Sequence, residues 1–323
     1  MASEAGDENY VSPLDEASQQ KCRNELNERS PADTLIAVQT LRQWVKEQDW
    51  LKTPTGYAFL LRFLRFRKFS QLEARKALEK FWTVRTGRPE WFTGGDPADP
   101  VLNKVLKMGL ICSPRRRDKH GRRVIFSRLA GMDMEYLKQI GMSKVYQVVT
   151  LVYDWLVWDE HVQIEGVVTV VDYDGLTMQL VTTFSNREFK KEYMEYFQKA
   201  LPIRLKSMNA FHEPPFFDAV WAISSAFMSQ KLKDRFHLHG KSLVKIFEEV
   251  GYECMPDEYL PDDYEGPRLG TCADIIDEMI EDLNKPEFIK YIRDLSSGKY
   301  GVDKSRVPAQ TEVVGSFRKI SAD

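Results

Sequence analysis

The stretch VVTVV at residues 167–171 constrains the fold more than any other part of the sequence. Its five residues are all β-branched and show no alternation with charged side chains, so it predicts a strand that is buried on both faces. Segments with helical spacing precede and follow it. A doubly buried strand between helices is typical of an α/β protein, in which helices cover a sheet with parallel pairs.

Two aspartates, Asp172 and Asp174, follow this strand at its carboxyl end, where open α/β sheets usually place their sites. One interpretation is a phosphotransferase of the haloacid-dehalogenase type, in which one aspartate attacks phosphorus and the other handles the leaving-group proton. Such enzymes have a threonine where Leu176 stands here, and the acidic pair Asp262-Asp263 follows no apolar strand. We therefore expect Asp172 and Asp174 to end the strand and open a turn.

The composition suits a globular protein, because 43% of the 323 residues are hydrophobic. The net charge of −2 argues against a partner such as nucleic acid. The opening MASEAGDENY lacks the basic and apolar regions of a secretory signal, and no apolar stretch is long enough to span a membrane. Four scattered cysteines favour free thiols in a reducing compartment. We expect a cytoplasmic protein.

We expect neither a metal site nor a cofactor. His237 and His239 alternate on a short segment and could share a metal ion, but no third ligand accompanies them. A Ser-His-Asp arrangement stays open, although no Gly-x-Ser-x-Gly motif supports one.

The first part of the chain predicts a helical bundle. Residues 1–29 are polar and lack an apolar period, so we expect a mobile tail. Ser30 and Pro31 mark the start of a helix, since a capping residue precedes proline at the first helical position. A second helix follows in YAFLLRFLRFRKF, and Ser70 with Glu73 forms a capping box that opens a third. A three-helix bundle is therefore expected at residues 30–87.

After a linker rich in glycine and proline, the pattern changes to alternating strands and helices, which marks a domain boundary. We expect an α/β domain at residues 88–270 and C-terminal helices with a tail at 271–323. Strands are expected at 110–113, 123–129, 167–171, 203–210 and in FHLHG. Helices are expected at 143–158, 178–183 and 187–200, and in PPFFDAVWAISSAFM, SQKLKDR and SLVKIFEEV.

Two of these helices carry unusually broad apolar faces. The arc on the 143–158 helix is wider than packing against one sheet requires, so it indicates either a deeply buried helix or the wall of a cavity. In PPFFDAVWAISSAFM, large apolar side chains cover one face and mostly small ones cover the other. The candidate cavity residues are Val145, Val148, Val149, Val152, Tyr153, Leu156, Phe216, Phe217, Val220, Trp221, Ile223 and Phe227.

The stretches FLLRFLRFRKF, RDKHGRRVIF, VVDYDGLTM and FQKALPIRLKSMNAFHEPPFFDAVWAISSAFMSQKLKDRFHLHG resemble the CRAL-TRIO family in unbroken order from about residue 30 to 270. The likeness is greatest to its tocopherol and retinaldehyde branches, and the tail VVGSFRKISAD resembles insect members. The resemblance implies an N-terminal helical bundle followed by an α/β lipid-binding domain, with a mixed sheet and helices around an apolar cavity. The PPFFDAVWAISSAFM segment would be a mobile helical gate over that cavity.

The resemblance also implies a small hydrophobic ligand. The tocopherol-binding branch has serines at the positions of Val149 and Tyr153, so a retinoid, carotenoid or sesquiterpenoid is as compatible as tocopherol. Tyr153 or Thr150 could anchor a polar end of such a ligand.

A group of basic residues is expected beside the gate. In ALPIRLKSM, Arg204 and Lys206 point to the side opposite Ile203 and Leu205, because strand side chains alternate. A solvated charged surface is one interpretation. The resemblance implies instead a patch that binds phosphatidylinositol phosphates, formed by Arg67, Arg204, Lys206, Lys231 and Arg235. Lys233, which lies between the last two in the sequence, is a further candidate for this patch.

These expectations combine into a monomeric intracellular carrier that binds a hydrophobic ligand, associates peripherally with phosphoinositide-containing membranes and is not an enzyme. The alternative is a phosphoinositide-dependent membrane adaptor without transferable cargo.

Overall fold

The computed structural model describes residue 7, residues 10–183 and residues 186–307. The tail at 313–323 that resembles insect proteins lies outside these residues, as do most of the first nine positions. The expected N-terminal bundle is present as α2 (Pro31–Lys46), α3 (Tyr57–Phe66) and α4 (Gln71–Gly87). Ser30 and Ser70 cap α2 and α4 through their side-chain oxygens, as their sequence positions predict.

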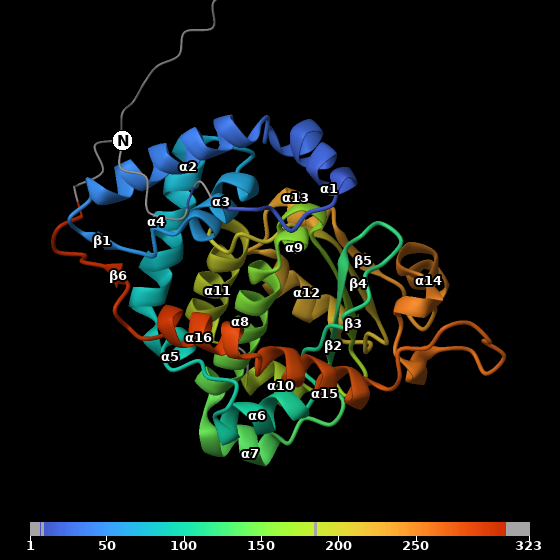
Figure 1. Ribbon diagram of the computed structural model, residues 1–323. Helices are drawn as coiled ribbons and strands as arrows, with labels where there is room; N and C mark the ends of the chain where they lie inside the picture. The colour runs from blue at the N-terminus through green and yellow to red at the C-terminus, as the bar shows by residue number, and fades with distance from the viewer. Residues whose placement is uncertain (1–6, 8–9, 184–185, 308–323) are drawn as a thin grey trace, which may run out of the picture.

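The segment before the bundle differs from the mobile tail that we expected. It forms α1 (Glu16–Lys21) and a π-helix, η2 (Cys22–Leu26), and α1 packs against α9 (Glu160–Glu165) (Figure 1). Leu26 is fully buried in a small cluster with Ile164, and Lys21 forms an ion pair with Glu165. The sequence hides this contact because the apolar side chains are too few to give a helical period.

Four parallel strands form the main sheet, in the order β2-β3-β4-β5. They are β2 (Arg123–Arg128), β3 (Val167–Asp172), β4 (Leu205–Phe211) and β5 (Phe236–Leu238). Every residue of β3 is buried, as its β-branched sequence predicts. The segment 110–113, which we expected to be a strand, joins the edge of β2 through an isolated antiparallel bridge between Cys112 and Phe126.

Helices cover the sheet on both sides (Figure 1). The long helix α8 (Met142–Trp158) lies on one side together with α11 (Arg187–Lys199) and α12 (Phe217–Ser225), whereas α14 (Val244–Val250) lies on the other. The remaining helices are α5 (Pro89–Phe92), α6 (Pro100–Lys107), α7 (Met134–Ile140), α10 (Met178–Thr183), α13 (Gln230–Lys233), η3 (Tyr252–Cys254), η4 (Asp257–Tyr259), α15 (Cys272–Leu283) and α16 (Pro286–Leu295).

The chain returns to its N-terminal bundle near its end. β6 (Gly301–Val302) pairs antiparallel with β1 (Leu51–Lys52), and the backbone N–H of Val302 donates a hydrogen bond to the Thr86 hydroxyl at 2.9 Å. Residues 272–302 therefore do not form an independent appendage, because β6 pairs with a strand of the bundle.

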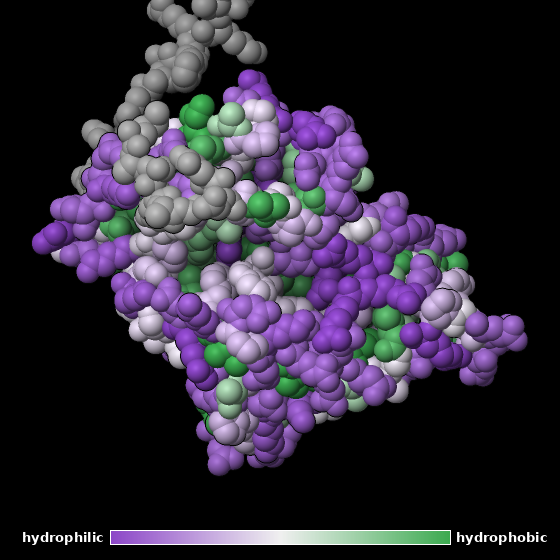
Figure 2. Space-filling view, in the orientation of Figure 1, coloured by the Kyte–Doolittle hydropathy of each residue, from purple (hydrophilic) through white to green (hydrophobic). Residues whose placement is uncertain are grey.

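One hydrophobic core runs through the bundle and the α/β domain. Buried charges also join the two parts: Arg85 on α4 pairs with Asp154 on α8, and both side chains are almost fully buried. The face shown in Figure 2 is mainly hydrophilic, with hydrophobic side chains in small separate patches. Within the described ranges, no helix is long and apolar enough to cross a membrane.

Candidate functional site

Basic side chains from three distant segments meet in one pocket of about 250 Å³. Arg67 comes from the end of α3, Arg204 and Lys206 from the start of β4, and Lys231 and Arg235 from α13 and the turn after it. The structure thus brings together five of the six basic residues that the sequence singles out. Lys233 is not among the residues that line the pocket, whereas Lys68, which the sequence analysis missed, is.

Local structure explains why these side chains converge. Arg204 immediately precedes β4, and its carbonyl accepts a hydrogen bond from Val167 at 2.9 Å. Gly166 permits this approach, since a Cβ at its positive φ of 80° would lie 2.2 Å from the same carbonyl oxygen. Lys231 and Arg235 are four residues apart around the short helix α13, so both face the pocket.

The pocket contains more positive than negative charge. Burial and the neighbouring Arg204 lower the pKa of Lys206 to about 8, and burial together with Arg235 lowers the pKa of Lys231. Among the described residues, the five basic side chains of the pocket form one ion pair, a long contact of 3.8 Å between Arg204 and Glu25. Clustered, partly buried cations with so few acidic partners favour an anionic ligand.

The pocket reaches Ser229, the residue that directly follows the PPFFDAVWAISSAFM segment named a gate in the sequence analysis. Gln198 on α11 lines the pocket, and its amide nitrogen donates a hydrogen bond of 2.9 Å to the carbonyl of Phe227. Its amide oxygen accepts one of 2.8 Å from the backbone N–H of Ser229, which also lines the pocket. One side chain thus connects the basic pocket to the chain that leaves α12.

The apolar candidates on α8 divide into two groups. Val145, Val148, Val152 and Leu156 are fully buried in the core. Val149 and Tyr153 keep accessible surface although they pack against the core, and the Tyr153 ring contacts Phe197 of α11 with ring centroids 5.5 Å apart. This second group, on the side of α8 that faces α11, is the part of the helix that a ligand could contact.

On α12, aromatic contacts hold the helix against the sheet. Phe217 is buried against Tyr173, with ring centroids 4.7 Å apart, and Trp221 contacts Phe236 of β5 at 4.4 Å. Phe216, Val220 and Phe227 are partly buried. Ile223 differs from the expectation: 53% of its surface is exposed, because it lies on the outer side of the helix.

Only one of the two expected polar anchors has a free hydroxyl. Thr150 donates to the carbonyls of Trp91 and Gln147, at 2.7 and 3.0 Å. Tyr153 forms no hydrogen bond with any described residue, and burial raises its pKa. The sequence analysis missed Thr169, which is buried in β3 with no hydrogen-bond partner for its hydroxyl within the described ranges.

Asp172 has a structural role at the end of β3. Its carboxylate accepts hydrogen bonds from the backbone N–H of Asp174 at 2.9 Å and from the hydroxyl of Tyr259 at 2.9 Å, and it lies 3.0 Å from Nδ1 of His212. The hydroxyl of Thr177 accepts from the N–H of Leu180 at the start of α10. These contacts fit the interpretation of a strand end followed by a turn.

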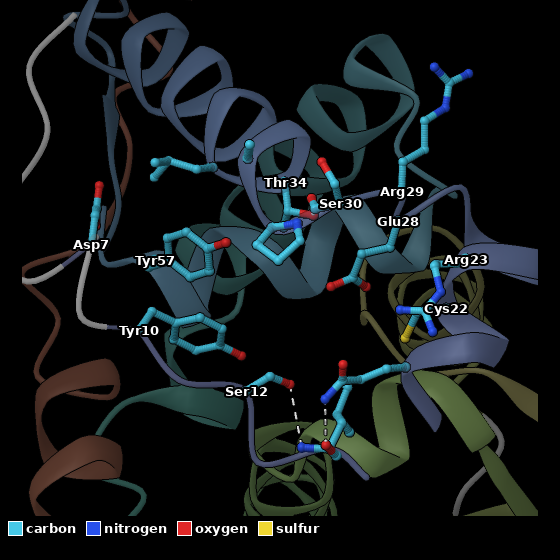
Figure 3. A pocket seen from close by; sticks show the side chains of 15 residues that line it. Asp7, Tyr10, Ser12, Cys22, Arg23, Glu28, Arg29, Ser30, Thr34 and Tyr57 are labelled. Atoms are coloured by element: carbon cyan, nitrogen blue, oxygen red, sulfur yellow. Dashed lines mark hydrogen bonds between the residues drawn. The ribbon is translucent and has the colours of Figure 1, made fainter. Parts of the chain in front are cut away.

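A further cavity, of about 360 Å³, lies between the N-terminal segment and the bundle (Figure 3). Tyr10 and Tyr57 stack on one side of it with ring centroids 4.3 Å apart, and Glu28 projects from another wall. Glu28 forms an ion pair with Arg65 at 2.8 Å. The many hydroxyl and charged side chains of this wall suit a polar ligand better than a long apolar one.

Comparison with known proteins places these features in a family. A family model described as the CRAL/TRIO domain matches residues 107–266, and one described as a Pinta-like UBA domain matches residues 30–102. The alpha-tocopherol transfer protein-like proteins of Mus musculus and Homo sapiens are 32% identical over 251 residues, which cover 77% of this chain and 71% of each relative. Clavesin-1 of Xenopus laevis is 26% identical over 242 residues, covering 74% of this chain and 71% of that protein.

The crystal structure of Sfh5 superposes with a TM-score of 0.46 and 13% identity, and the match covers 84% of this chain and 100% of that one. The sequence matches extend across the sheet, α8, α12 and the basic pocket. On their strength, the chain belongs to the CRAL/TRIO family of lipid-binding proteins.

Proposed function

We propose that this protein binds one small hydrophobic molecule and transfers it between membranes, with exchange directed by phosphoinositides. The convergence of Arg67, Arg204, Lys206, Lys231 and Arg235 in one pocket beside the chain that follows α12 carries the proposal. Ligands of the isoprenoid type, such as a retinoid, tocopherol, carotenoid or sesquiterpenoid, suit the apolar and aromatic surface that α8 and α12 provide.

The basic pocket supports recognition of a phosphorylated headgroup. Several cations that have few acidic partners gain favourable interactions when a multiply charged phosphate enters, and arginine binds phosphate oxygens in a bidentate manner. A membrane that displays such headgroups would bind the protein more tightly than a neutral one. The protein would then associate peripherally with that membrane in the cytoplasm.

Gln198 supports a connection between headgroup and cargo. It lines the pocket and hydrogen-bonds the chain on both sides of Met228, just after α12. A headgroup that displaces this amide would release the end of α12 and favour opening only at the correct membrane. The free hydroxyl of Tyr153 would bind the polar end of the cargo.

Charge reversal tests the proposal. We expect the variant with Arg204→Glu and Lys206→Glu to lose sedimentation with phosphoinositide vesicles and to transfer a fluorescent retinoid or tocopherol analogue at least about tenfold more slowly. Its affinity for the same analogue in solution should stay unchanged. The matched control carries Lys46→Glu and Lys52→Glu on the bundle, outside the pocket. Transfer as fast as that of the control would refute the proposal.

Organic extraction of freshly purified protein separates a carrier from an adaptor. A carrier should retain a small apolar molecule, which native mass spectrometry would detect as an added mass. Protein that binds phosphoinositide vesicles but neither retains nor takes up any hydrophobic molecule would be a membrane adaptor instead.

A further inference from the structure

Two buried arginines, one in the bundle and one in the α/β domain, have no acidic partner among the described residues. Arg62 of α3 is 4% exposed and Arg123 of β2 is 6% exposed. Within the described ranges, neither guanidinium forms an ion pair with a carboxylate, which is unusual because a buried charge without a partner is costly. Burial lowers the pKa of Arg123 to about 10.

Both guanidinium groups use the same nitrogen and leave the same edge free. Nη1 of Arg62 donates to the hydroxyl of Tyr291 at 2.6 Å, and Nη1 of Arg123 donates to the carbonyl of Arg115 at 3.0 Å. The Nε atoms of both are buried, and within the described chain they have no hydrogen-bond partner. The Nε and Nη2 donors form the edge that binds a carboxylate or phosphate through two parallel hydrogen bonds.

The two arginines line one pocket of about 480 Å³. Its apolar wall comes from the last turn of α8, which carries Trp155, Leu156 and Trp158. The Arg123 guanidinium stacks on the Trp155 ring at 4.8 Å from the centroid. Arg62 stacks on Tyr291, whose ring in turn stacks on Trp158. The pocket thus combines planar aromatic surfaces with two cationic edges.

Three of the carboxylates at the rim are already paired with other cations. Asp159 binds Arg117 at 2.8 Å, and Glu160 binds Arg65 at 2.7 Å. Asp282 binds both Arg115 and Lys285, at 2.8 and 2.7 Å. The fourth, Glu287, forms no ion pair in the described structure and lies exposed at the start of α16. Three of the four rim carboxylates are therefore paired with cations other than Arg62 and Arg123.

We propose that this pocket binds a small organic oxyanion, with a carboxylate or phosphate group on the free edges of Arg62 and Arg123 and an apolar or aromatic body against Trp155 and Trp158. The site is separate from the basic pocket, since the two share no lining residue. It joins α3 of the bundle to α8 and β2 of the α/β domain, so an occupant would stabilise the contact between them.

Calorimetric titration of the full chain with sodium benzoate and with sodium phosphate tests this site, with sodium chloride at equal ionic strength as the reference. We expect saturable binding in the millimolar range or tighter, and a rise in melting temperature. Benzoate binding better than phosphate would identify an aromatic carboxylate as the preferred class, and the reverse would identify a phosphate.

Arg62→Lys and Arg123→Lys keep the charge but remove the two-donor edge, so each should weaken binding by at least about tenfold. Arg293→Lys, an exposed arginine outside the pocket, should bind as wild type does. If a lysine variant folds poorly, the thermal melts of the wild-type protein decide. The proposal is overturned if neither benzoate nor phosphate raises the melting temperature above its value in sodium chloride. Binding that both lysine variants retain would also overturn it.

Discussion

Gln198 accepts a hydrogen bond of 2.8 Å from the backbone N–H of Ser229, four residues beyond the end of α12. The same side chain donates to the carbonyl of Phe227 and lines the basic pocket. It is therefore a contact through which the proposed headgroup could act on the gate. Because Gln198 is neutral, its removal tests this connection without changing the charge of the pocket.

We expect Gln198→Ala to release a bound fluorescent ligand several-fold faster, even at membranes without phosphoinositides. The loss of two hydrogen bonds should cost about 1–3 kcal/mol in the free energy of unfolding. Gln230→Ala on α13 is the control, since the Gln230 side chain donates a hydrogen bond to the exposed side chain of Asp234. Stopped-flow fluorescence would measure release, and equal rates in both variants would exclude a role for Gln198.

Vesicle binding should depend on pH through Lys206. Its pKa of about 8 means that the pocket loses one positive charge as the pH rises through this value. We expect sedimentation with phosphoinositide vesicles to weaken between about pH 7 and pH 9, although the headgroups themselves become more negative. Lys206→Arg keeps its charge over this range and should bind at both pH values. A wild-type profile as flat as that of Lys206→Arg would contradict the assignment.

The same lysine should affect stability in the opposite direction. An unfolded lysine titrates near about 10.4, so between about pH 8 and pH 10 the unfolded chain binds more protons at this position than the folded one. The contribution of Lys206 to the free energy of unfolding should therefore rise with pH across this window. Urea denaturation of wild type and Lys206→Met at both ends of the window would measure the difference, which should shrink as the pH rises.

Two neighbouring valines on α8 provide a matched test for space beside this helix. Val148 is fully buried, whereas Val149 keeps accessible surface toward α11. Val148→Phe should overpack the core and destabilise the ligand-free protein by about 1–3 kcal/mol. Val149→Phe should cost much less stability but weaken ligand retention. Equal losses of stability in thermal melts would argue against free volume at Val149.

The N-terminal segment offers a direct test of its burial. Leu26 is fully buried against Ile164, so Leu26→Ala should destabilise this contact by about 2–5 kcal/mol if the segment unfolds with the rest of the protein. Leu72→Ala is the control, because Leu72 is 62% exposed. Hydrogen exchange at residues 16–26 would show whether the segment opens alone or together with α9.

Much of the fold follows from local sequence signals. The unbroken β-branched run of β3, the cap residues Ser30 and Ser70 and the broad apolar stripe of α8 each predict the element that the structure shows. Helices α5, α6, α7 and α9 were missed because they are short and lie in segments rich in glycine, proline and charge. A strand was expected at 110–113 because its residues are apolar. They are linked to β2 by an isolated bridge rather than by a continuous ladder of backbone hydrogen bonds.

The residues of the basic pocket could be predicted from the family resemblance but not from strand alternation alone. Alternation in ALPIRLKSM predicts that Arg204 and Lys206 share a side, but only the fold brings Arg67 from a position more than a hundred residues away. The sequence gives no signal for the two hydrogen bonds of Gln198 or for the missing partners of Arg62 and Arg123. These features depend on which hydrogen bonds and ion pairs the surrounding residues form in the fold.

The pairing of β1 with β6 makes the chain a closed loop: Leu51 faces Val302, and the whole α/β domain lies between them. Removing either β1 or β6 would break this pairing. The boundary near residue 87 therefore separates two sequence patterns but not two independently unfolding units. A fragment that begins after α4 would leave β6 without its partner strand and the aromatic face of Tyr300 without Trp82. The bundle and the lipid-binding domain should accordingly melt in one transition. The backbone amides of β1 and β6 should also exchange their hydrogens at the same rate as each other.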